Sequence, residues 1–442
     1  MTNKKPHINV IGAGLAGCEA AYQAANRGVS VTLYEMKPEK YTPAHHSPKF
    51  AELVCSNSLR SDELSNAIGV LKQELRNMSS LIMEAADNNK VAAGSALAVD
   101  REKFSSYITE KISNHPNIEI SYGEVTEISP DEITVIATGP LTSDALAKHI
   151  SEKFELGSLH FYDAAAPIVD FESIDMSKAF FASRYNKGDA DYINCPMNET
   201  EYKNFYNALI TAKEADLHDI DNELTVFEGC MPVEVMAKRG YETLLFGPLK
   251  PVGIENPVTK ETYYAVVQLR KENNDGTMYN IVGFQTHLTF PEQKRVFSMI
   301  PGLENASFLR YGVMHRNTYL NSPSVLSYDY SLVKNPNVFF AGQMTGVEGY
   351  IESTSSGFVA GINASRRAKG LDSIDFTTKT VIGALSHYVS TGNVCKNFQP
   401  MNANFGIVSP LDHKVKGGKK ARNEEIAKRA LAYIDEIKEN IR

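Results

Sequence analysis

The sequence predicts an α/β protein in which a nucleotide-binding domain with a parallel sheet is interrupted by an inserted α+β domain. Three observations predict this fold. A strand, a glycine turn and a helix open the chain at residues 7–36. A second unit of strand, glycine turn and helix occurs at residues 337–369. Between them, residues 160–334 alternate short strand patterns with loops rich in Pro and Gly, as expected for a separate, strand-rich domain.

The opening unit carries a dinucleotide-binding motif between its first strand and its helix. Gly12 permits the tight turn, Gly14 lets the backbone approach a pyrophosphate, and Gly17 lets the helix lie close to the strand. The helix N-terminus offers N–H groups and a positive dipole end to the phosphates. The next strand ends at Glu35, where a carboxylate can accept hydrogen bonds from a ribose diol. The expected cofactor-binding residues here are Gly12, Ala13, Gly14, Leu15, Ala16, Gly17 and Glu35.

Two later segments are expected to return to the same ligand. A strand at residues 132–136 runs into Ala-Thr-Gly139, although an ordinary turn after a strand would look the same. A buried strand at 337–341 runs into Gly342 and Gln343, and the helix that follows is rich in small residues, including Gly357. Small residues let the backbone come close to a flat ligand. A C-terminal return favours FAD over a nicotinamide cofactor, because FAD is long and its isoalloxazine lies at the far end. The expected domains are therefore a Rossmann-like, two-dinucleotide-fold FAD-binding domain formed by residues 1–190 and 335–442, with residues 191–334 inserted.

The remaining elements follow from periodicity and capping residues. One apolar stripe predicts a helix over 67–88, and Asp100 is a suitable N-cap for a helix to about residue 114. A short strand is expected near 118–120. The segment 414–422 is basic and is either a solvated loop or a patch that contacts phosphates, and a helix is expected from about 423 to 441.

Bulk composition limits the function classes. The formal charge of −8 excludes a broadly basic nucleic-acid binder but not a local basic patch. No apolar run approaches the roughly 18–20 residues of a membrane helix, and the chain enters a strand too early for a signal peptide. The five cysteines are widely spaced and form no Cys-x-x-Cys, which indicates a reducing, cytoplasmic location without disulfides or a zinc site.

Two cysteines stand in contexts that suggest chemistry. Cys55 follows a short apolar run and precedes a polar loop with Arg60, and such surroundings can favour a thiolate. Cys230 lies between a Gly and a Met-Pro pair, which suggests a fixed turn. Each cysteine could instead be a small buried apolar residue. Cys18 is expected to pack in the dinucleotide helix.

Other polar residues are less informative. Cys195 and Cys395 have no distinguishing context. His45 and His46 lack a second ligand pair, so no metal is expected. His287 and His315 could be structural or could face a ligand.

Several segments of the chain are long and distinctive: residues 42–46, 51–61, 96–101, 161–169, 227–232, 282–288, 311–318 and 396–402. Through them, nearly the whole chain resembles the TrmFO family, the folate- and FAD-dependent tRNA (uracil-5-)-methyltransferases. The GidA-like flavoproteins that modify the tRNA wobble uridine are more distant, since they are longer and lack these cysteine contexts. Small departures from the family pattern are Ala13 in an otherwise all-glycine opening and a polar stretch at 353–357.

The resemblance implies an RNA uridine C5-methyltransferase that forms 5-methyluridine. The carbon donor would be 5,10-methylenetetrahydrofolate, and FAD reduced by NAD(P)H would supply the electrons. Cys55 and Cys230 match family cysteines implicated in catalysis, with their individual roles left open. The expected target is a T-loop uridine of tRNA, and a 23S rRNA uridine is the alternative.

Two alternatives without RNA chemistry stay open: a flavin oxidoreductase of a small molecule, and a non-enzymatic interaction protein stabilised by FAD.

If RNA is the substrate, its binding should be local and electrostatic. The candidate phosphate contacts are Lys238, Arg239, Lys294, Arg295, Arg316 and the basic segment 414–422, with Lys419 and Lys420.

Overall fold

A computed structural model describes most of the chain. Cys230 and Cys395 lie outside the described residues, so the expectations about them remain predictions. The described ranges are 5–156, 158–164, 166–186, 189–215, 231–272, 276–312, 314–390, 398 and 400–441.

The first sheet is parallel and has the strand order β16-β7-β1-β2-β6. In register, Val10 of β1 lies beside Leu33 of β2 and Val135 of β7, so the central strand is hydrogen-bonded on both sides. The last strand comes from a distant part of the sequence, which confirms the expected return of the chain. The strands are β1 (His7–Ile11), β2 (Ser30–Glu35), β6 (Ile118–Tyr122), β7 (Thr134–Ile136) and β16 (Val338–Phe340).

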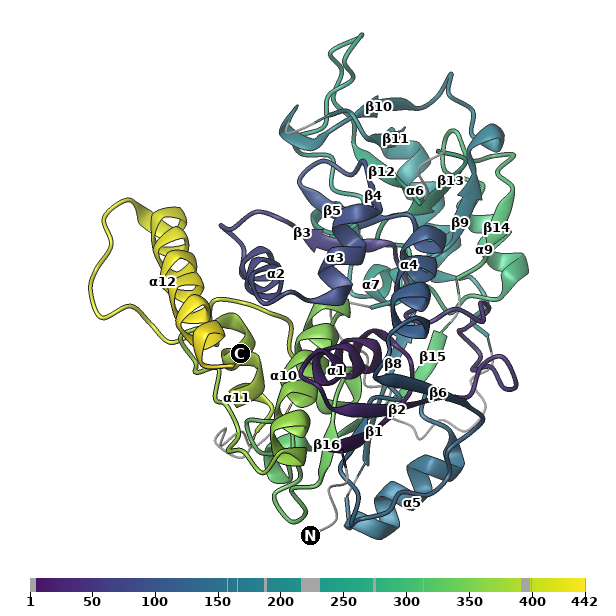
Figure 1. The fold of residues 1–442 in the computed structure, drawn as a ribbon. Helices are drawn as coiled ribbons and strands as arrows, with labels where there is room; N and C mark the ends of the chain where they lie inside the picture. The colour runs from purple at the N-terminus through teal and green to yellow at the C-terminus, as the bar shows by residue number, and fades with distance from the viewer. Residues whose placement is uncertain are drawn as a thin grey trace.

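Two helices rich in small residues cross on one face of this sheet, α1 (Leu15–Asn26) and α10 (Tyr350–Ala368) (Figure 1). A Cβ added at Gly357 would lie 2.1 Å from the Ala16 carbonyl oxygen, and one at Gly361 would lie 2.5 Å from Ala20. Gly357 and Gly361 therefore serve close packing of α10 against α1, whereas Ser353 of the same helix lines the pocket described below.

The other helices of this domain surround the sheet. The expected helix over 67–88 is two helices, because Ser79 has a φ of 60° and Ser80 begins a new helix by accepting a hydrogen bond from Met83 N (3.2 Å). The buried Glu19 accepts from Ser80 Oγ (2.8 Å) and Ile82 N (3.0 Å), which fixes the break. Asp100 caps its helix as expected. These helices are α2 (Ala67–Asn77), α3 (Leu81–Asn88), α4 (Arg101–Ser113), α5 (Asp144–Phe154), α11 (Val381–Tyr388) and α12 (Gly418–Asn440).

The second sheet is antiparallel, with the order β10-β11-β12-β13-β9-β14, and it has a hydrophobic core separate from that of the first sheet. Its strands β9 and β10 precede residue 191, so the sheet begins before the expected boundary. The strands are β9 (Ile168–Asp170), β10 (Phe180–Ala182), β11 (Tyr192–Met197), β12 (Ala265–Lys271), β13 (Met278–Ile281) and β14 (Phe308–Arg310). The helices packed with them are α6 (Glu199–Ile210), α7 (Val233–Lys238), α8 (Thr243–Phe246) and α9 (Phe290–Phe297).

Two strands join the domains. β8 (Ser158–Ala164) leads toward the second sheet, β15 (Met314–Leu320) leads back, and the two pair antiparallel. The chain thus leaves and re-enters the first domain side by side, as an insertion requires (Figure 1). A small third sheet is formed by β3 (Ser58–Ser61), β4 (Lys90–Val91) and β5 (Ala96–Val99).

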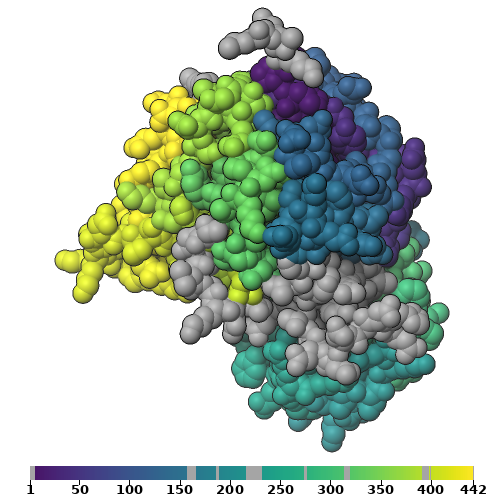
Figure 2. All heavy atoms as spheres, turned by 90° about the horizontal axis from the view of Figure 1, so that it is seen from below, coloured from purple at the N-terminus to yellow at the C-terminus, as the bar shows by residue number. Residues whose placement is uncertain are grey.

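The surface below the first sheet shows how the two parts of its domain close on each other. Figure 2 places the blue segment that ends near residue 156 beside the green segment around 324–335. Asn335 Nδ2 donates to the Pro130 carbonyl (2.9 Å) across this contact.

The short 3-10 turns complete the secondary structure. They are η1 (Phe171–Ser173), η2 (Arg184–Asn186), η4 (Ser322–Ser324) and η5 (Gln343–Thr345). Among the described residues, no helix is both long and apolar enough to cross a bilayer.

Candidate nucleotide pocket and cysteine site

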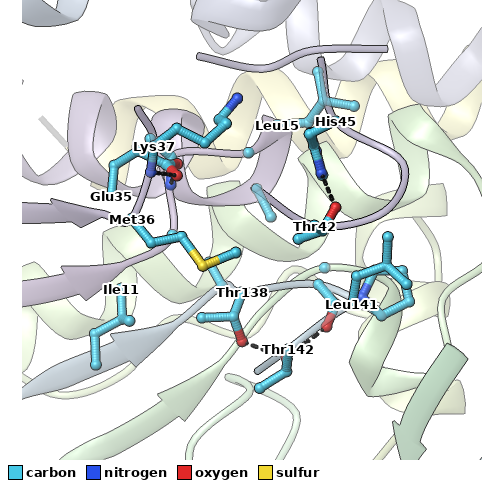
Figure 3. A pocket seen from close by; sticks show the side chains of 18 of the residues that line it. Ile11, Leu15, Glu35, Met36, Lys37, Thr42, His45, Thr138, Leu141 and Thr142 are labelled. Atoms are coloured by element: carbon cyan, nitrogen blue, oxygen red, sulfur yellow. Dashed lines mark hydrogen bonds between the residues drawn. The ribbon is translucent and has the colours of Figure 1, made fainter. Parts of the chain in front are cut away.

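A pocket lies at the carboxyl ends of β1, β2, β7 and β16, the edge at which open α/β sheets bind ligands (Figure 3). It gathers the opening motif, the segment after β7 and the second glycine turn, as expected. Gly17 and Gly357 lie behind it, in helix contacts. The expected residues that line the pocket are Gly12, Ala13, Gly14, Leu15, Ala16, Glu35, Gly139, Gly342 and Gln343.

The three motif glycines have different surroundings. Gly12 has a φ of +98°, and a Cβ there would lie 2.7 Å from the Ala137 carbonyl oxygen. A Cβ at Gly17 would lie 1.8 Å from the Gly12 carbonyl oxygen, so this glycine lets α1 start against the turn. A Cβ at Gly14 would meet no atom within 4 Å. The space at Gly14 is therefore open to the pocket, where the N-terminus of α1 can receive a pyrophosphate.

Glu35 lies at the end of β2 and faces this turn. Its Oε2 accepts from Ala13 N (2.9 Å) and its Oε1 accepts from Lys37 N (2.9 Å). Figure 3 shows the contact with Lys37. Because an ionised carboxylate offers about four acceptor sites, Glu35 can fix the turn and still accept from a ribose diol.

The opposite wall comes from the segment after β7 and from the second glycine turn. The Thr138 and Thr142 hydroxyls lie 2.6 Å apart, and Met36 extends toward them (Figure 3). Gly342 N donates to Ser356 Oγ (2.6 Å), and the Gln343 amide donates to the Glu348 carboxylate (2.7 Å). These bonds hold both segments in place around the pocket.

Sequence reasoning from motifs missed part of the lining. Thr42 and His45 reach the pocket from the loop after β2, and their side chains lie 2.6 Å apart (Figure 3). Their only signal was the family resemblance of residues 42–46, since the loop has no periodicity of its own.

Cys55 lies next to the far end of the pocket. Its N–H donates to Tyr350 Oη (2.8 Å), and both Tyr350 and Val54 line the pocket. Its carbonyl accepts from Arg101 Nη2 (3.0 Å) and Arg310 Nη2 (3.1 Å). Arg101 begins α4 in the first domain and Arg310 ends β14 in the second, so both domains position this cysteine.

The surroundings of Cys55 are electropositive. Arg101 pairs with the buried Glu272 (2.9 Å), and Arg270 Nη2 donates to Ser56 Oγ (2.5 Å). Three arginines, Arg101, Arg270 and Arg310, thus surround Cys55. Within the part of the chain that the structure describes, only Arg101 among them has a carboxylate within 4 Å. Burial and the charge of Arg101 lower the pKa of Arg310, and burial raises the pKa of Tyr350, so the phenol keeps its proton. Sequence reasoning did not identify these residues, because they come from distant elements.

His287 lies in an ion-pair network of the second domain. Its Nε2 is 2.7 Å from Glu214 Oε2, and its Nδ1 is 2.6 Å from Glu234 Oε1. Burial lowers the pKa of His287, but the two carboxylates outweigh it and raise the pKa above its usual value. With a carboxylate close to each ring nitrogen, this buried histidine links α7 to the segment before α9.

The other described cysteines are buried packing residues. Cys18 Sγ donates to the Ala13 carbonyl (3.3 Å), and burial raises its pKa. Burial raises the pKa of Cys195 to about 12. Within the ranges that the structure describes, no group of three or more His, Cys, Asp or Glu side chains is arranged for a metal ion.

The basic residues expected to contact RNA differ in whether an acidic side chain pairs with them. Lys238 pairs with Glu214, and Arg295 pairs with Glu292. Lys294 is exposed. Arg239 has an interaction of its own, and Arg316 is placed by its backbone in β15. The basic segment does not remain a loop throughout, because α12 begins at Gly418, five residues earlier than expected, and Lys414, Lys419 and Arg422 line a hollow beside its first turns.

Comparison with known proteins first defines the class. The family described as Glucose inhibited division protein A matches residues 7–372. Two crystal forms of Aquifex aeolicus GidA superpose with TM-scores of 0.70 and 0.71 at 17% identity. They cover 99% and 98% of this chain, and 74% and 76% of theirs. The fold is therefore that of a Rossmann-like α/β protein of the GidA type with an inserted domain.

Closer relatives define the branch. A protein of Acetivibrio thermocellus is 61% identical over 97% of this chain and 98% of its own length. Proteins of Lactobacillus delbrueckii and Listeria monocytogenes are 58% and 57% identical, over 99% and 98% of this chain and 99% of their own lengths. All three are named methylenetetrahydrofolate--tRNA-(uracil-5-)-methyltransferase TrmFO. This chain belongs to the TrmFO family.

Proposed function

We propose that this protein methylates C5 of a uridine in tRNA. The methyl carbon comes from 5,10-methylenetetrahydrofolate, the redox cofactor is FAD, and the reductant is NAD(P)H. The observation that carries the proposal is that Tyr350 both lines the nucleotide pocket and binds the backbone of Cys55. A flavin in this pocket and a nucleophile for uracil would therefore be neighbours. The names of the relatives support RNA over a small-molecule substrate, and favour tRNA over 23S rRNA.

The residues of the pocket suit FAD. The open space at Gly14 and the N-terminus of α1 would hold the pyrophosphate, and Glu35 would hold the adenosine ribose. Gly342 and Gln343 would lie along the other half of the cofactor. When bound, reduced FAD supplies the two electrons that convert a methylene carbon into a methyl group.

The cysteines supply the activation that uracil needs. Uracil C5 is a poor nucleophile, but addition of a thiolate to C6 gives C5 enolate character. C5 can then form a bond to the electrophilic methylene carbon, and loss of the C5 proton together with cleavage of the bond from that carbon to the folate nitrogen leaves an exocyclic methylene on the ring. A hydride equivalent from the reduced cofactor would convert this methylene into the methyl group, and the thiolate would be expelled from C6 as the C5–C6 double bond re-forms. We assign Cys55 and Cys230 to this chemistry, one as nucleophile and the other as its partner. Arg101 and Arg310 would fix the Cys55 backbone during these steps.

The test is RNA mass spectrometry on a deletion strain of the source organism, which we propose holds the protein in its cytoplasm. Loss of 5-methyluridine from tRNA, restored by the wild-type chain and by Cys195→Ala but not by Cys55→Ala, is the expected result. Loss confined to 23S rRNA would transfer the activity to rRNA. Unchanged 5-methyluridine in both RNAs would contradict the proposal.

A further inference from the structure

Three aromatic rings form a continuous stack in the second domain. They come from α9, from β14 and from the residue that follows β14, and Figure 1 shows these two elements as neighbours. The centroids of Phe290 and Tyr311 are 4.8 Å apart with the rings inclined by 15°. Those of Tyr311 and Phe308 are 5.3 Å apart and inclined by 11°. Phe290 is the outer ring and is 51% exposed. The stack is thus open to solvent at Phe290, the ring at its outer end.

The stack is held rigidly from below. The buried Gln293, on the same helix as Phe290, donates to the Gly312 carbonyl (2.8 Å) and accepts from Gly312 N (2.8 Å). Gln293 also donates to the Leu288 carbonyl (2.7 Å). Because Gly312 follows Tyr311 in the chain, these bonds hold the backbone that carries Tyr311 against the helix that carries Phe290. An exposed ring fixed in this way loses little conformational freedom on binding.

The stack is connected to the proposed catalytic cysteine. Arg310, the residue before Tyr311, donates to the Val54 and Cys55 carbonyls (2.6 and 3.1 Å). A cation also accompanies the exposed ring, since Lys294 follows Phe290 by one helical turn and is exposed. Arg295 is occupied by Glu292. An exposed ring and a cation on one helix face suit a base and its neighbouring phosphate.

We propose that Phe290 is a platform on which an unpaired base of the RNA substrate stacks, with Lys294 at an adjacent phosphate. This inference rests on the proposed function, because it takes RNA as the substrate. A uridine that reacts at C5 with a thiolate at C6 must leave its stack, which leaves a flanking base without a neighbour. Aromatic side chains replace that neighbour in many RNA-binding proteins.

Affinity for tRNA tests the platform. Phe290→Ala in the FAD-loaded protein should weaken tRNA binding roughly 5- to 150-fold, the range that stacking of one base on an aromatic ring contributes. Phe290→Tyr should bind like wild type. Phe246→Ala is the matched control, because Phe246 is 78% exposed and has no ring partner among the described residues. That variant should bind like wild type.

A fluorescence measurement reports on stacking itself. The chain contains no tryptophan, so Phe290→Trp introduces a single reporter. Addition of tRNA should quench its emission, because a base stacked on the indole opens a quenching path, whereas Phe246→Trp should keep its emission. The Phe290→Trp protein should also retain wild-type affinity, because the indole keeps a flat face on which a base can stack.

The outcomes separate the two proposals. If the wild-type protein neither binds nor methylates tRNA, the proposed function fails. If it does both, and Phe290→Ala binds tRNA like wild type or no more weakly than Phe246→Ala, the platform alone is overturned. A change of oligomeric state in Phe290→Ala at unchanged tRNA affinity would make the stack an interface between copies and would also overturn it.

Discussion

Gly14 and Gly17 are three residues apart, but a side chain at each would meet different atoms. At Gly14 it would enter the open pocket, and at Gly17 it would collide with the Gly12 carbonyl. We expect Gly14→Val to purify without flavin, since valine would fill the pyrophosphate space, and to unfold at the temperature of the flavin-free wild-type protein. Gly17→Ala should instead lower the unfolding temperature. Full flavin absorbance per chain in Gly14→Val would show that the cofactor lies elsewhere.

The cysteines allow a second residue-level prediction. Cys55→Ala and Cys230→Ala should each lower the rate of methyl transfer at least about 10³-fold, a typical penalty for losing a covalent nucleophile or its acid/base partner. Cys18→Ala, Cys195→Ala and Cys395→Ala should retain activity. Single-turnover formation of 5-methyluridine measures this. An active Cys55→Ala or Cys230→Ala enzyme would remove that residue from the mechanism.

The glycines and Glu35 were predictable because their motif encodes local geometry within about 25 residues of sequence. Arg101, Arg310 and Tyr350 were not predictable in the same way. They reach Cys55 from α4, β14 and α10, and only the folded chain brings these elements together. Short-range patterns carry no information about such a convergence.

At the scale of elements, His287 ties α7 to the segment that precedes α9. The carboxylates of Glu214 and Glu234 raise its pKa above the unfolded value of about 6.5. A raised pKa means that the stabilisation is fully present below pH 6.5 and is lost as the pH rises through the raised value.

We therefore expect the free energy of unfolding to fall as the pH rises above about 6.5 and through the raised pKa of His287. His287→Gln should flatten this dependence and should cost about 3–5 kcal/mol at the lower pH, because it leaves a buried carboxylate unpaired. Urea unfolding at several pH values measures both effects. His387→Gln is the control, since His387 pairs with the exposed Asp375. Equal pH slopes in wild type and His287→Gln would refute the assignment.

The elements themselves were largely predictable, and the exceptions have physical causes. The parallel strands and α10 follow from buried runs and glycine turns. The break between α2 and α3 depends on Glu19, which is about 60 residues away in sequence, so helical periodicity could not show it. The second sheet begins at β9, because that strand pairs with β13 and β14 from much later in the chain.

At the scale of the whole molecule, an acidic protein would have to bind a polyanion through local cations. Lys419 lines the hollow beside α12 and Lys420 lies on the same helix. Replacing both with Gln should flatten the plot of log affinity for tRNA against log salt by roughly 0.7–0.9 for each phosphate that the variant no longer binds. Oxidation of NAD(P)H by the flavin should not change. A double variant of Lys148 and Lys153 on α5, which removes the same charge, is the control. An unchanged salt slope in the Lys419/Lys420 variant would show that the basic segment 414–422 is solvated and does not contact phosphates.

The central claim is that a folate methylene becomes the methyl group of 5-methyluridine at a site shared by a flavin and Cys55. The most direct measurement supplies purified protein, FAD, NAD(P)H and an unmodified tRNA transcript with 5,10-methylenetetrahydrofolate deuterated at its methylene carbon. The account predicts 5-methyluridine whose methyl group carries both deuterium atoms of the donor, and no product from Cys55→Ala or without reductant. Unlabelled 5-methyluridine, or labelled product formed equally well by Cys55→Ala, would contradict it.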